Sequence, residues 1–274
     1  QMKKLTVFCA AACLAASAAA QNHPDLHEVL DRQKGRNLIE IPKGTYTLDV
    51  RNNGPYKFHN LTDVHINGNG STVICNNQEQ AFSFYNCVRV ELRDLTIDYD
   101  PLCFTQGEIT AVAEDGSWFD VRIDEGYPVT GLAANRVQFY DPQTRLLKRN
   151  SITTYTSNYS ALKQLGHNLF RAVKNGTWSA GEQVGDLVVM DVKTDKPNAG
   201  VHTVMLNKCY NTKLENVTVY GSNTFSFFEK EGYANEYRNC VVDRGPMPQG
   251  IRPRLRSGNA DGIHSSQARK GPTV

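Results

Sequence analysis

The chain has 274 residues, with 30 Lys and Arg against 28 Asp and Glu, so its formal net charge is only +2 at pH 7. Both signs are interspersed, which excludes the strongly basic surface of a nucleic-acid-binding protein and the polybasic segment of a membrane-surface protein. The length suits one large domain or two small ones.

The N-terminus is predicted to be a secretory signal peptide, residues 1–20. Residues 2–4 are basic, residues 5–16 are apolar, and residues 17–20 end in a small-x-small pattern, so we expect cleavage before Gln21. The apolar run is about 12 residues, shorter than the roughly 20 that span a bilayer. We therefore expect an exported protein, secreted or periplasmic, without a membrane span.

A short helix and two strands are predicted at the start of the mature chain. Residues 24–34 place Leu26, Val29 and Leu30 on one face of a helix, which Gly35 ends. The next stretch, residues 39–48, has the pattern of a strand, a turn and a strand. A fold of stacked repeats needs a cap at its open end, and this amphipathic helix provides one.

Short apolar strands separated by polar Asn, Gly and Asp corners recur along the chain. Residues 60–68, 86–97 and 208–219 are three copies in one side-chain register, a fourth covers residues 237–242, and a fifth begins at residue 272. The aligned positions that we expect to point inward are Ile66, Leu92 and Leu214, then Leu95 with Val217 and Ile97 with Val219.

A strand repeat of about 23–26 residues cannot bury its apolar face alone. Stacked copies bury it, with neighbouring strands about 4.8 Å apart. A leucine-rich repeat has a similar length, but its signature pattern is absent, and an antiparallel sandwich would not keep one register over consecutive copies. The sequence therefore predicts an all-β fold, a right-handed parallel β-helix with an N-terminal capping helix.

The repeat is interrupted over residues 101–199. Residues 107–113 and 118–123 flank a Glu-Asp-Gly-Ser turn, which predicts a β-hairpin, and two more short strands are expected at residues 136–140 and 186–192. We predict a small antiparallel β subdomain, looped out between coils. The expected organisation is thus a signal peptide (1–20), a cap and first coils (21–100), the insert (101–199) and resumed coils (200–274).

Cysteines and histidines predict no metal site and no cofactor. Five cysteines remain after the predicted signal peptide, an odd number without any CxxC spacing, so neither a disulfide framework nor a zinc site is indicated. The histidines show no metal-ligand spacing. The five cysteines, most of which we expect to act as small buried hydrophobic residues, are Cys75, Cys87, Cys103, Cys209 and Cys240.

The densest group of polar side chains lies near the end of the chain. Ile263 is expected to point inward and His264 outward, with Asp261 at the corner where this strand begins. Arg254 precedes them and is a candidate to contact sugar hydroxyls or a carboxylate. The purely structural alternative is an Asx-turn at Asp261 beside a surface histidine.

A second group follows the repeat. Asp98, Tyr220 and Asp243 each come directly after an aligned inward residue, so they are predicted to share one outward column. Glu229 and Glu231 are expected in loops beside it. Paired carboxylates serve as acid and base in glycoside hydrolysis, whereas the alternative is an ordinary solvated outer face.

Two known groups of proteins share these motifs. Residues 41–46 (Ile-Pro-Lys-Gly-Thr-Tyr) resemble the entry strand of pectin-lyase-like β-helix proteins. Residues 95–101, the insert, and residues 259–264 (Asn-Ala-Asp-Gly-Ile-His) together resemble glycoside hydrolase family 110, in the same order and over most of the mature chain. That family contains exo-acting α-galactosidases that cleave terminal α-1,3-linked galactose with inversion.

The resemblance implies the roles of several residues. The family has an Ala-Asp-x-x-His segment whose aspartate is catalytic, so Asp261 is the expected catalytic residue, on the general-base side. An oligo- or polysaccharide is the implied substrate. The side chains that we expect to bind it are His264, Arg254, Asp243, Asp98 and Glu229.

The family has a further pair of aspartates about one coil after that segment, and the present sequence ends at Val274 before that position. We therefore expect a C-terminally truncated enzyme with an open sheet edge, inactive alone because it lacks the acid partner. The Gly-Ile inside the segment is unusual for the family, which indicates a relative of it.

Two other functions fit the same pattern. A polysaccharide lyase would need clustered carboxylates for Ca²⁺ and a basic residue beside a uronate, and Arg252, Arg254 and Arg256 are candidates for the basic residue. A non-catalytic carbohydrate-binding or surface β-helix is the third possibility, since a fold does not fix a function.

Overall fold

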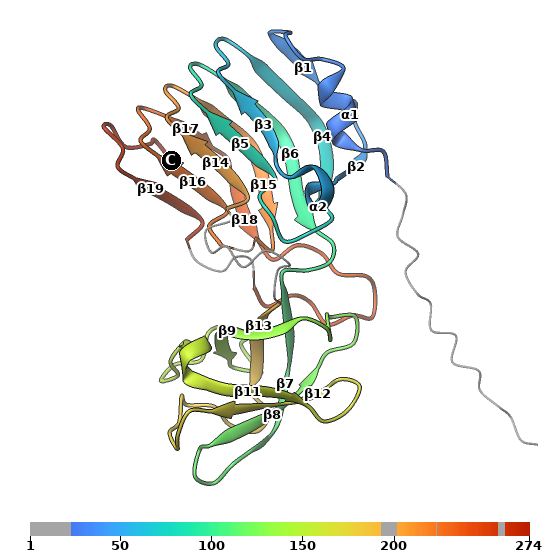
Figure 1. Ribbon diagram of the computed structural model, residues 1–274, viewed down its shortest axis with the longest axis vertical. Coiled ribbons are helices and arrows are strands. Elements are labelled where there is room, and N and C mark those ends of the chain that lie inside the picture. The colour runs from blue at the N-terminus through green and yellow to red at the C-terminus, as the bar shows by residue number, and fades with distance from the viewer. Residues whose placement is uncertain (1–22, 193–201, 223, 257–260) are drawn as a thin grey trace, which may run out of the picture.

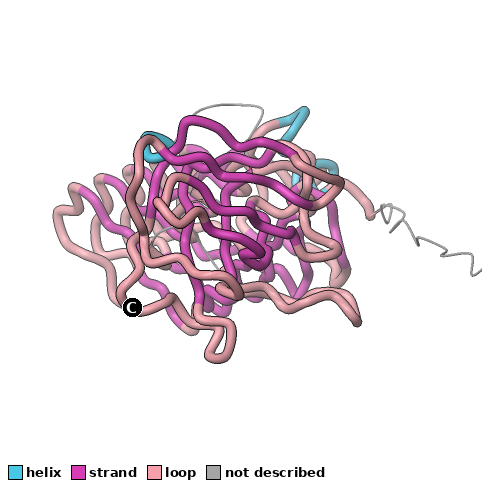
Figure 2. The backbone as a smooth tube through the Cα atoms, turned by 90° about the horizontal axis from the view of Figure 1, so that it is seen from below, coloured by secondary structure: helices cyan, strands magenta, loops and turns pink. Residues whose placement is uncertain are grey.

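The computed structural model describes residues 23–192, 202–222, 224–256 and 261–274 (Figure 1). Strands dominate the described chain, which confirms the all-β prediction, and Figure 2 shows how little of the backbone is helical. The predicted signal peptide, as well as Asn259 and Ala260 of the family-like segment, lie outside the described residues. Within the described ranges, no helix is long and apolar enough to cross a membrane.

The predicted N-terminal helix is present but short. It is α1 (Leu26–Asp31), and it begins at Asp25 because this side chain accepts a hydrogen bond from the His27 N–H at 3.0 Å. Leu26 and Leu30 are fully buried against the first strands. The other helical segments are α2 (Val50–Asn53) and the 3₁₀ turn η1 (Thr156–Asn158).

Two parallel sheets form the upper body in Figure 1. The first, sheet A, has the order β1-β4-β6-β15-β17, with β2 and β18 beside β4 and β15. The register predicted from the repeats is confirmed, since Ile66 pairs with Leu92, Leu92 with Leu214, and Leu214 with Tyr237. The strands of sheet A are β1 (Leu38–Glu40), β2 (Thr45–Leu48), β4 (His65–Cys75), β6 (Glu91–Tyr99), β15 (Lys213–Tyr220), β17 (Glu236–Arg238) and β18 (Val241–Asp243).

The second parallel sheet, sheet B, has the order β19-β16-β14-β5-β3. Its inward residues pack against those of sheet A in one hydrophobic core. The predicted fifth copy also pairs, because Thr273 forms a parallel bridge with Glu236. The strands of sheet B are β3 (Tyr56–His59), β5 (Phe82–Tyr85), β14 (Val204–Asn207), β16 (Phe227–Lys230) and β19 (Ile263–Ser266).

The polar residues that follow the strands of sheet B lie next to one another, as the strands themselves do. After each sheet B strand, one residue takes a left-handed backbone conformation with φ between 53° and 58°. Two of these corners hold asparagines, and the Asn86 amide donates to the Asn60 side-chain oxygen at 2.8 Å. Asparagine adopts positive φ more easily than most residues, which explains its recurrence there. The five corner residues are Asn60, Asn86, Lys208, Glu231 and Gln267.

A seven-stranded antiparallel sheet forms the lower body of Figure 1, with its own hydrophobic cluster. The expected hairpin is present as β7 (Phe104–Val112) with β8 (Trp118–Ile123). Gly107 is required there, because a Cβ would lie 2.2 Å from the Arg122 carbonyl oxygen. The other strands are β9 (Leu132–Tyr140) and β13 (Leu187–Val192), and the unpredicted β10 (Thr154–Tyr155), β11 (Tyr159–Gln164) and β12 (Leu169–Lys174).

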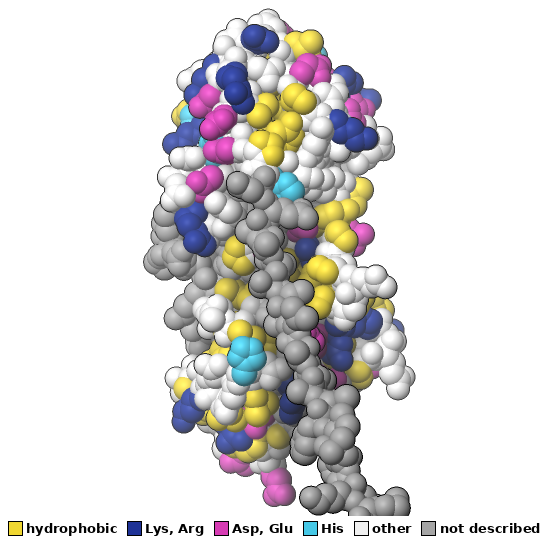
Figure 3. All heavy atoms as spheres, turned by 90° about the vertical axis from the view of Figure 1, so that its right-hand side faces the viewer, with side chains coloured by type: hydrophobic (Ala, Val, Ile, Leu, Met, Phe, Trp, Pro, Cys, Tyr) yellow, Lys and Arg dark blue, Asp and Glu magenta, His cyan; other side chains and the backbone are white. Residues whose placement is uncertain are grey.

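The segment after β18 links the two bodies. It runs beside β7, where the Gln106 side chain donates to the Pro253 carbonyl and accepts from the Leu255 N–H, at 3.0 and 2.9 Å. Charges of both signs are spread over the face of the molecule in Figure 3, as the balanced composition predicts.

Candidate functional site

Three of the predicted site carboxylates lie along one edge, where strands of sheet A end and the chain turns toward sheet B. Asp98 is the second-last residue of β6, Asp243 ends β18, and Asp261 lies two residues before β19. The predicted outward column is confirmed for Tyr220 and Asp243, which are paired neighbours on β15 and β18. Asp98 directly follows Ile97, which pairs with Val219 of β15.

Asp261 forms a close pair with His264. The Asp261 Oδ2 and His264 Nδ1 atoms are 2.7 Å apart, and the side chains are 58% and 39% exposed. Both therefore reach solvent. The His264 ring is also held by a stack on Phe225, with centroids 4.4 Å apart and planes 1° apart. A carboxylate that fixes one ring nitrogen orients the imidazole.

The aromatic stack continues to His202, for which the sequence predicts no role. The His202 ring contacts two phenylalanine rings, with its centroid 4.8 Å from that of Phe225 and 4.3 Å from that of Phe228. Burial, and then the charge of His264, lowers the pKa of His202 to about 4, so this ring is neutral at physiological pH. The sequence could have indicated this residue by its position, because His202 lies two residues before β14 as Phe225 lies two residues before β16.

Asp98 and Arg254, which were each predicted to bind substrate, form an ion pair that lies largely inside the protein. Arg254 Nη1 and Nη2 donate to the two Asp98 carboxylate oxygens at 2.8 and 3.0 Å, and the side chains are only 6% and 11% exposed. Arg254 also donates to the Arg244 carbonyl at 3.2 Å. Both charges are thus satisfied by each other, and the geometry supports a role in holding the segment after β18 against β6.

Glu229 was expected in a loop beside the outward column, and that placement is wrong. It lies within β16 and points between the two sheets, with no exposed surface. Its carboxylate accepts from Asn235 Nδ2 at 2.9 Å and from Ser265 Oγ at 3.3 Å, and within the described ranges no cation pairs with it. The alternation along β16 explains the error, because Phe227 is inward and the second residue after it must be inward too.

Burial raises the pKa of Glu229, against a smaller lowering by its two hydrogen-bond donors. The folded protein therefore holds this proton more tightly than the unfolded chain, so Glu229 destabilises the fold increasingly as pH rises through the unfolded and then the folded pKa. We expect Glu229→Gln to raise the melting temperature by several degrees at pH 8 and to leave it unchanged near pH 4.

Thermal melting of both proteins over this pH range checks the expectation. Glu114→Gln is the matched control, because Glu114 is exposed and its replacement removes the same charge. An equal shift at pH 4 and pH 8, or the same shift in the control, would contradict the assignment of a buried proton to Glu229.

No group of three or more His, Cys, Asp or Glu side chains within the described ranges is arranged to hold a metal ion. The cysteines named above are all free, four buried and Cys240 partly buried. Comparison with known proteins adds no family: no family model matches the chain, and no curated protein matches its sequence.

Proposed function

We propose that the protein is an exported carbohydrate-active enzyme, an inverting exo-glycosidase that acts on terminal α-linked galactose. The proposed framework is a right-handed parallel β-helix carrying the antiparallel sheet as an insert. What supports it is the alternation of the chain between the two parallel sheets, from β4 to β5 to β6 and, after the insert, from β14 to β15 to β16. Each turn of the chain thereby adds one strand to each sheet.

One observation carries the proposed activity: the exposed Asp261 carboxylate is 2.7 Å from an imidazole that is stacked on an aromatic ring. A solvent-facing carboxylate of this kind can accept a proton from an attacking water. The partly exposed ring of Phe228 beside it offers an apolar surface for the sugar C–H groups. Asp243, exposed at the same edge, is proposed to bind a sugar hydroxyl.

The acid that protonates the leaving oxygen is proposed to come from a coil stacked on β19, whose outer edge has no partner within the described chain. A carboxylate on such a coil would be about 4.8 Å away along the stacking direction. A diagonal offset brings the separation to the roughly 6.5–9.5 Å that inversion requires. This arrangement agrees with the aspartate pair that the resemblance to family 110 implies.

The test is a direct measurement of product stereochemistry. We expect the full-length protein to release galactose from an α-1,3-linked galactoside. Proton NMR during the first minutes should show the β-anomer forming before mutarotation. Release of the α-anomer would contradict inversion, and binding without release would favour a non-catalytic carbohydrate-binding protein.

The lyase alternative loses support from the placement of the arginines. Arg254 and Arg256 are buried in ion pairs with Asp98 and Asp191, and Arg252 lies 2.9 Å from Asp124. A guanidinium that is already paired is a poor base. An unsaturated product that absorbs in the ultraviolet would nevertheless revive the lyase.

A further inference from the structure

The outer face of sheet B is a continuous surface that begins at the proposed catalytic site. The strands are paired in parallel register, so their outward residues form two rows that cross all five strands. Neighbouring residues in a row are about 4.8 Å apart. The first row is Lys57, Ser83, Met205, Phe228 and His264, and the second is His59, Tyr85, Asn207, Lys230 and Ser266.

These two rows contain no carboxylate. Lys57 and Lys230 have no acidic partner within ion-pair distance in the described parts of the chain. Lys208, at the corner after β14, has only a loose contact with Glu231, at 3.8 Å between Nζ and Oε2. Apart from Asp261, which pairs with His264 at one end of the first row, the face therefore carries uncompensated positive charge, which attracts anions from solution.

The outer face of sheet A differs from that of sheet B in its charge. There, acidic and basic side chains alternate across the strands and pair with one another. Glu91 lies 2.8 Å from His65 and 3.2 Å from Lys213, and Glu236 lies 3.0 Å from Arg238. Both sheets are parallel, so the one-sided charge of sheet B comes from its sequence and not from the strand direction.

The sheet B rows also carry rings and small polar groups. Tyr85 is 38% exposed, and the Lys208 ammonium lies 5.9 Å from its ring centroid. Phe228 is partly exposed beside His264. Exposed rings stack on the C–H faces of sugars, and serine and asparagine side chains exchange hydrogen bonds with hydroxyl groups.

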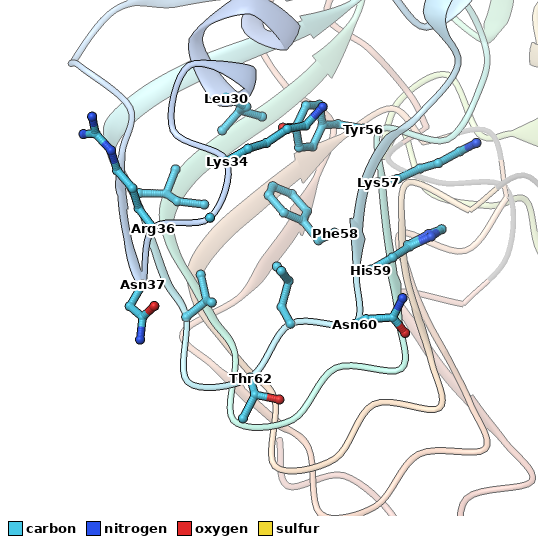
Figure 4. Close-up of a pocket in the computed structure, with 14 residues that line it drawn as sticks. Leu30, Lys34, Arg36, Asn37, Tyr56, Lys57, Phe58, His59, Asn60 and Thr62 are labelled. Carbon is cyan, nitrogen blue, oxygen red and sulfur yellow. The ribbon is translucent and has the colours of Figure 1, made fainter.

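A pocket adjoins the far end of sheet B, on the side of β3 that Phe58 faces. Its volume is about 400 Å³, and it lies between β3 and the turn after α1 (Figure 4). Lys57 and His59 project from β3 to the same side, away from Phe58, while Lys34 and Arg36 border the pocket from the opposite wall. Lys34 pairs with Asp31 at 2.8 Å, so within the described chain Arg36 is the unpaired cation that this wall adds.

We propose that the outer face of sheet B binds an anionic polysaccharide, one whose sugars carry carboxylate or sulfate groups. The inference rests on the proposed function and names the class of its substrate. A nucleic acid fits less well, because its charge density calls for many more basic contacts than these few lysines supply. Sparse cations, rings and small hydroxyl or amide groups instead match a chain of lightly charged sugars.

Affinity measurements on the full chain test the proposal, with three polymers as probes: polygalacturonate, a sulfated galactan and a neutral galactan. We expect binding to at least one anionic polymer, weakened by added salt, and no comparable binding to the neutral one. The anionic polymer that binds identifies carboxylate or sulfate as the recognised group.

The decisive variant is Lys57→Glu/Lys230→Glu, which should weaken that binding by about tenfold or more, because two attractions become repulsions. The matched control is Lys43→Glu/Lys163→Glu, which makes the same charge change at exposed positions outside the two rows and should leave the affinity within about twofold. Circular dichroism should show the same fold for all three proteins.

Three results would overturn the proposal: equal affinity for the neutral galactan, equal losses in the two double variants, or equally tight binding of duplex DNA. These are distinct from failure of the proposed function. Anionic binding that depends on Lys57 and Lys230 without any galactose release would refute only the glycosidase, and release from neutral galactosides without anionic binding would refute only the present inference.

Discussion

Asp261→Asn is expected to lower kcat for galactose release by about 10²–10⁴-fold, the usual contribution of a general base. The change keeps the size of the side chain and its position beside His264, but an amide cannot take the proton of the attacking water. The KM should change little, because the sugar contacts remain. Steady-state kinetics on the full-length protein measures kcat and KM.

His264→Gln separates catalysis from positioning. His264 is the positioning residue for Asp261, since His264 Nδ1 lies 2.7 Å from Asp261 Oδ2. Its loss should reduce kcat less than Asp261→Asn does. Asp63→Asn, an exposed aspartate on the turn before β4, is the control that should retain full activity. Full activity in Asp261→Asn would remove Asp261 from the catalytic role.

Arg254→Met is expected to destabilise the protein by about 3–5 kcal/mol, because it leaves the Asp98 charge buried without its partner. The methionine occupies a similar volume, so the loss is electrostatic more than steric. The double variant Asp98→Asn/Arg254→Met should recover part of this stability, since the stranded charge is gone. Chemical denaturation of the three proteins measures the differences.

The control for this prediction is another bidentate ion pair, which is exposed instead of buried. Arg89 donates to both Asp63 carboxylate oxygens at 2.6 and 2.7 Å, as Arg254 does to Asp98, but its side chain is largely exposed. Arg89→Met should therefore change the stability little. If the two single variants lost equal stability, burial would not be the reason that Arg254 matters.

The register of the repeats was predictable because each copy carries the same short pattern of apolar residues. Ile66, Leu92 and Leu214 occupy the same place in each copy, and the structure pairs them directly. The hairpin of β7 and β8 was also predictable from its turn. Strands β10, β11 and β12 were missed, since short strands in an irregular insert lack a repeat to compare with.

Contacts between distant parts of the chain escaped prediction. Arg254 and Asp98 are separated by 156 positions, and no local pattern marks two such residues as partners. Glu229 was misplaced because a charged residue is exposed by default, whereas strand alternation puts this one inside. The stack of His202, Phe225 and His264 was missed because its members come from three successive turns of the chain.

The position of the antiparallel sheet has a consequence for the order of folding. Pairing β6 with β15 joins residues about 122 positions apart, as in the hydrogen bond from Asn216 to Asp94. In an unfolded chain such a long loop is costly to close. The antiparallel sheet removes most of that cost, because β13 pairs with β7 and sets Asp191 opposite Phe104. Once it has formed, it holds the end of β6 close to the chain that leads into β14, so that β14 can pair with β5 and β15 with β6.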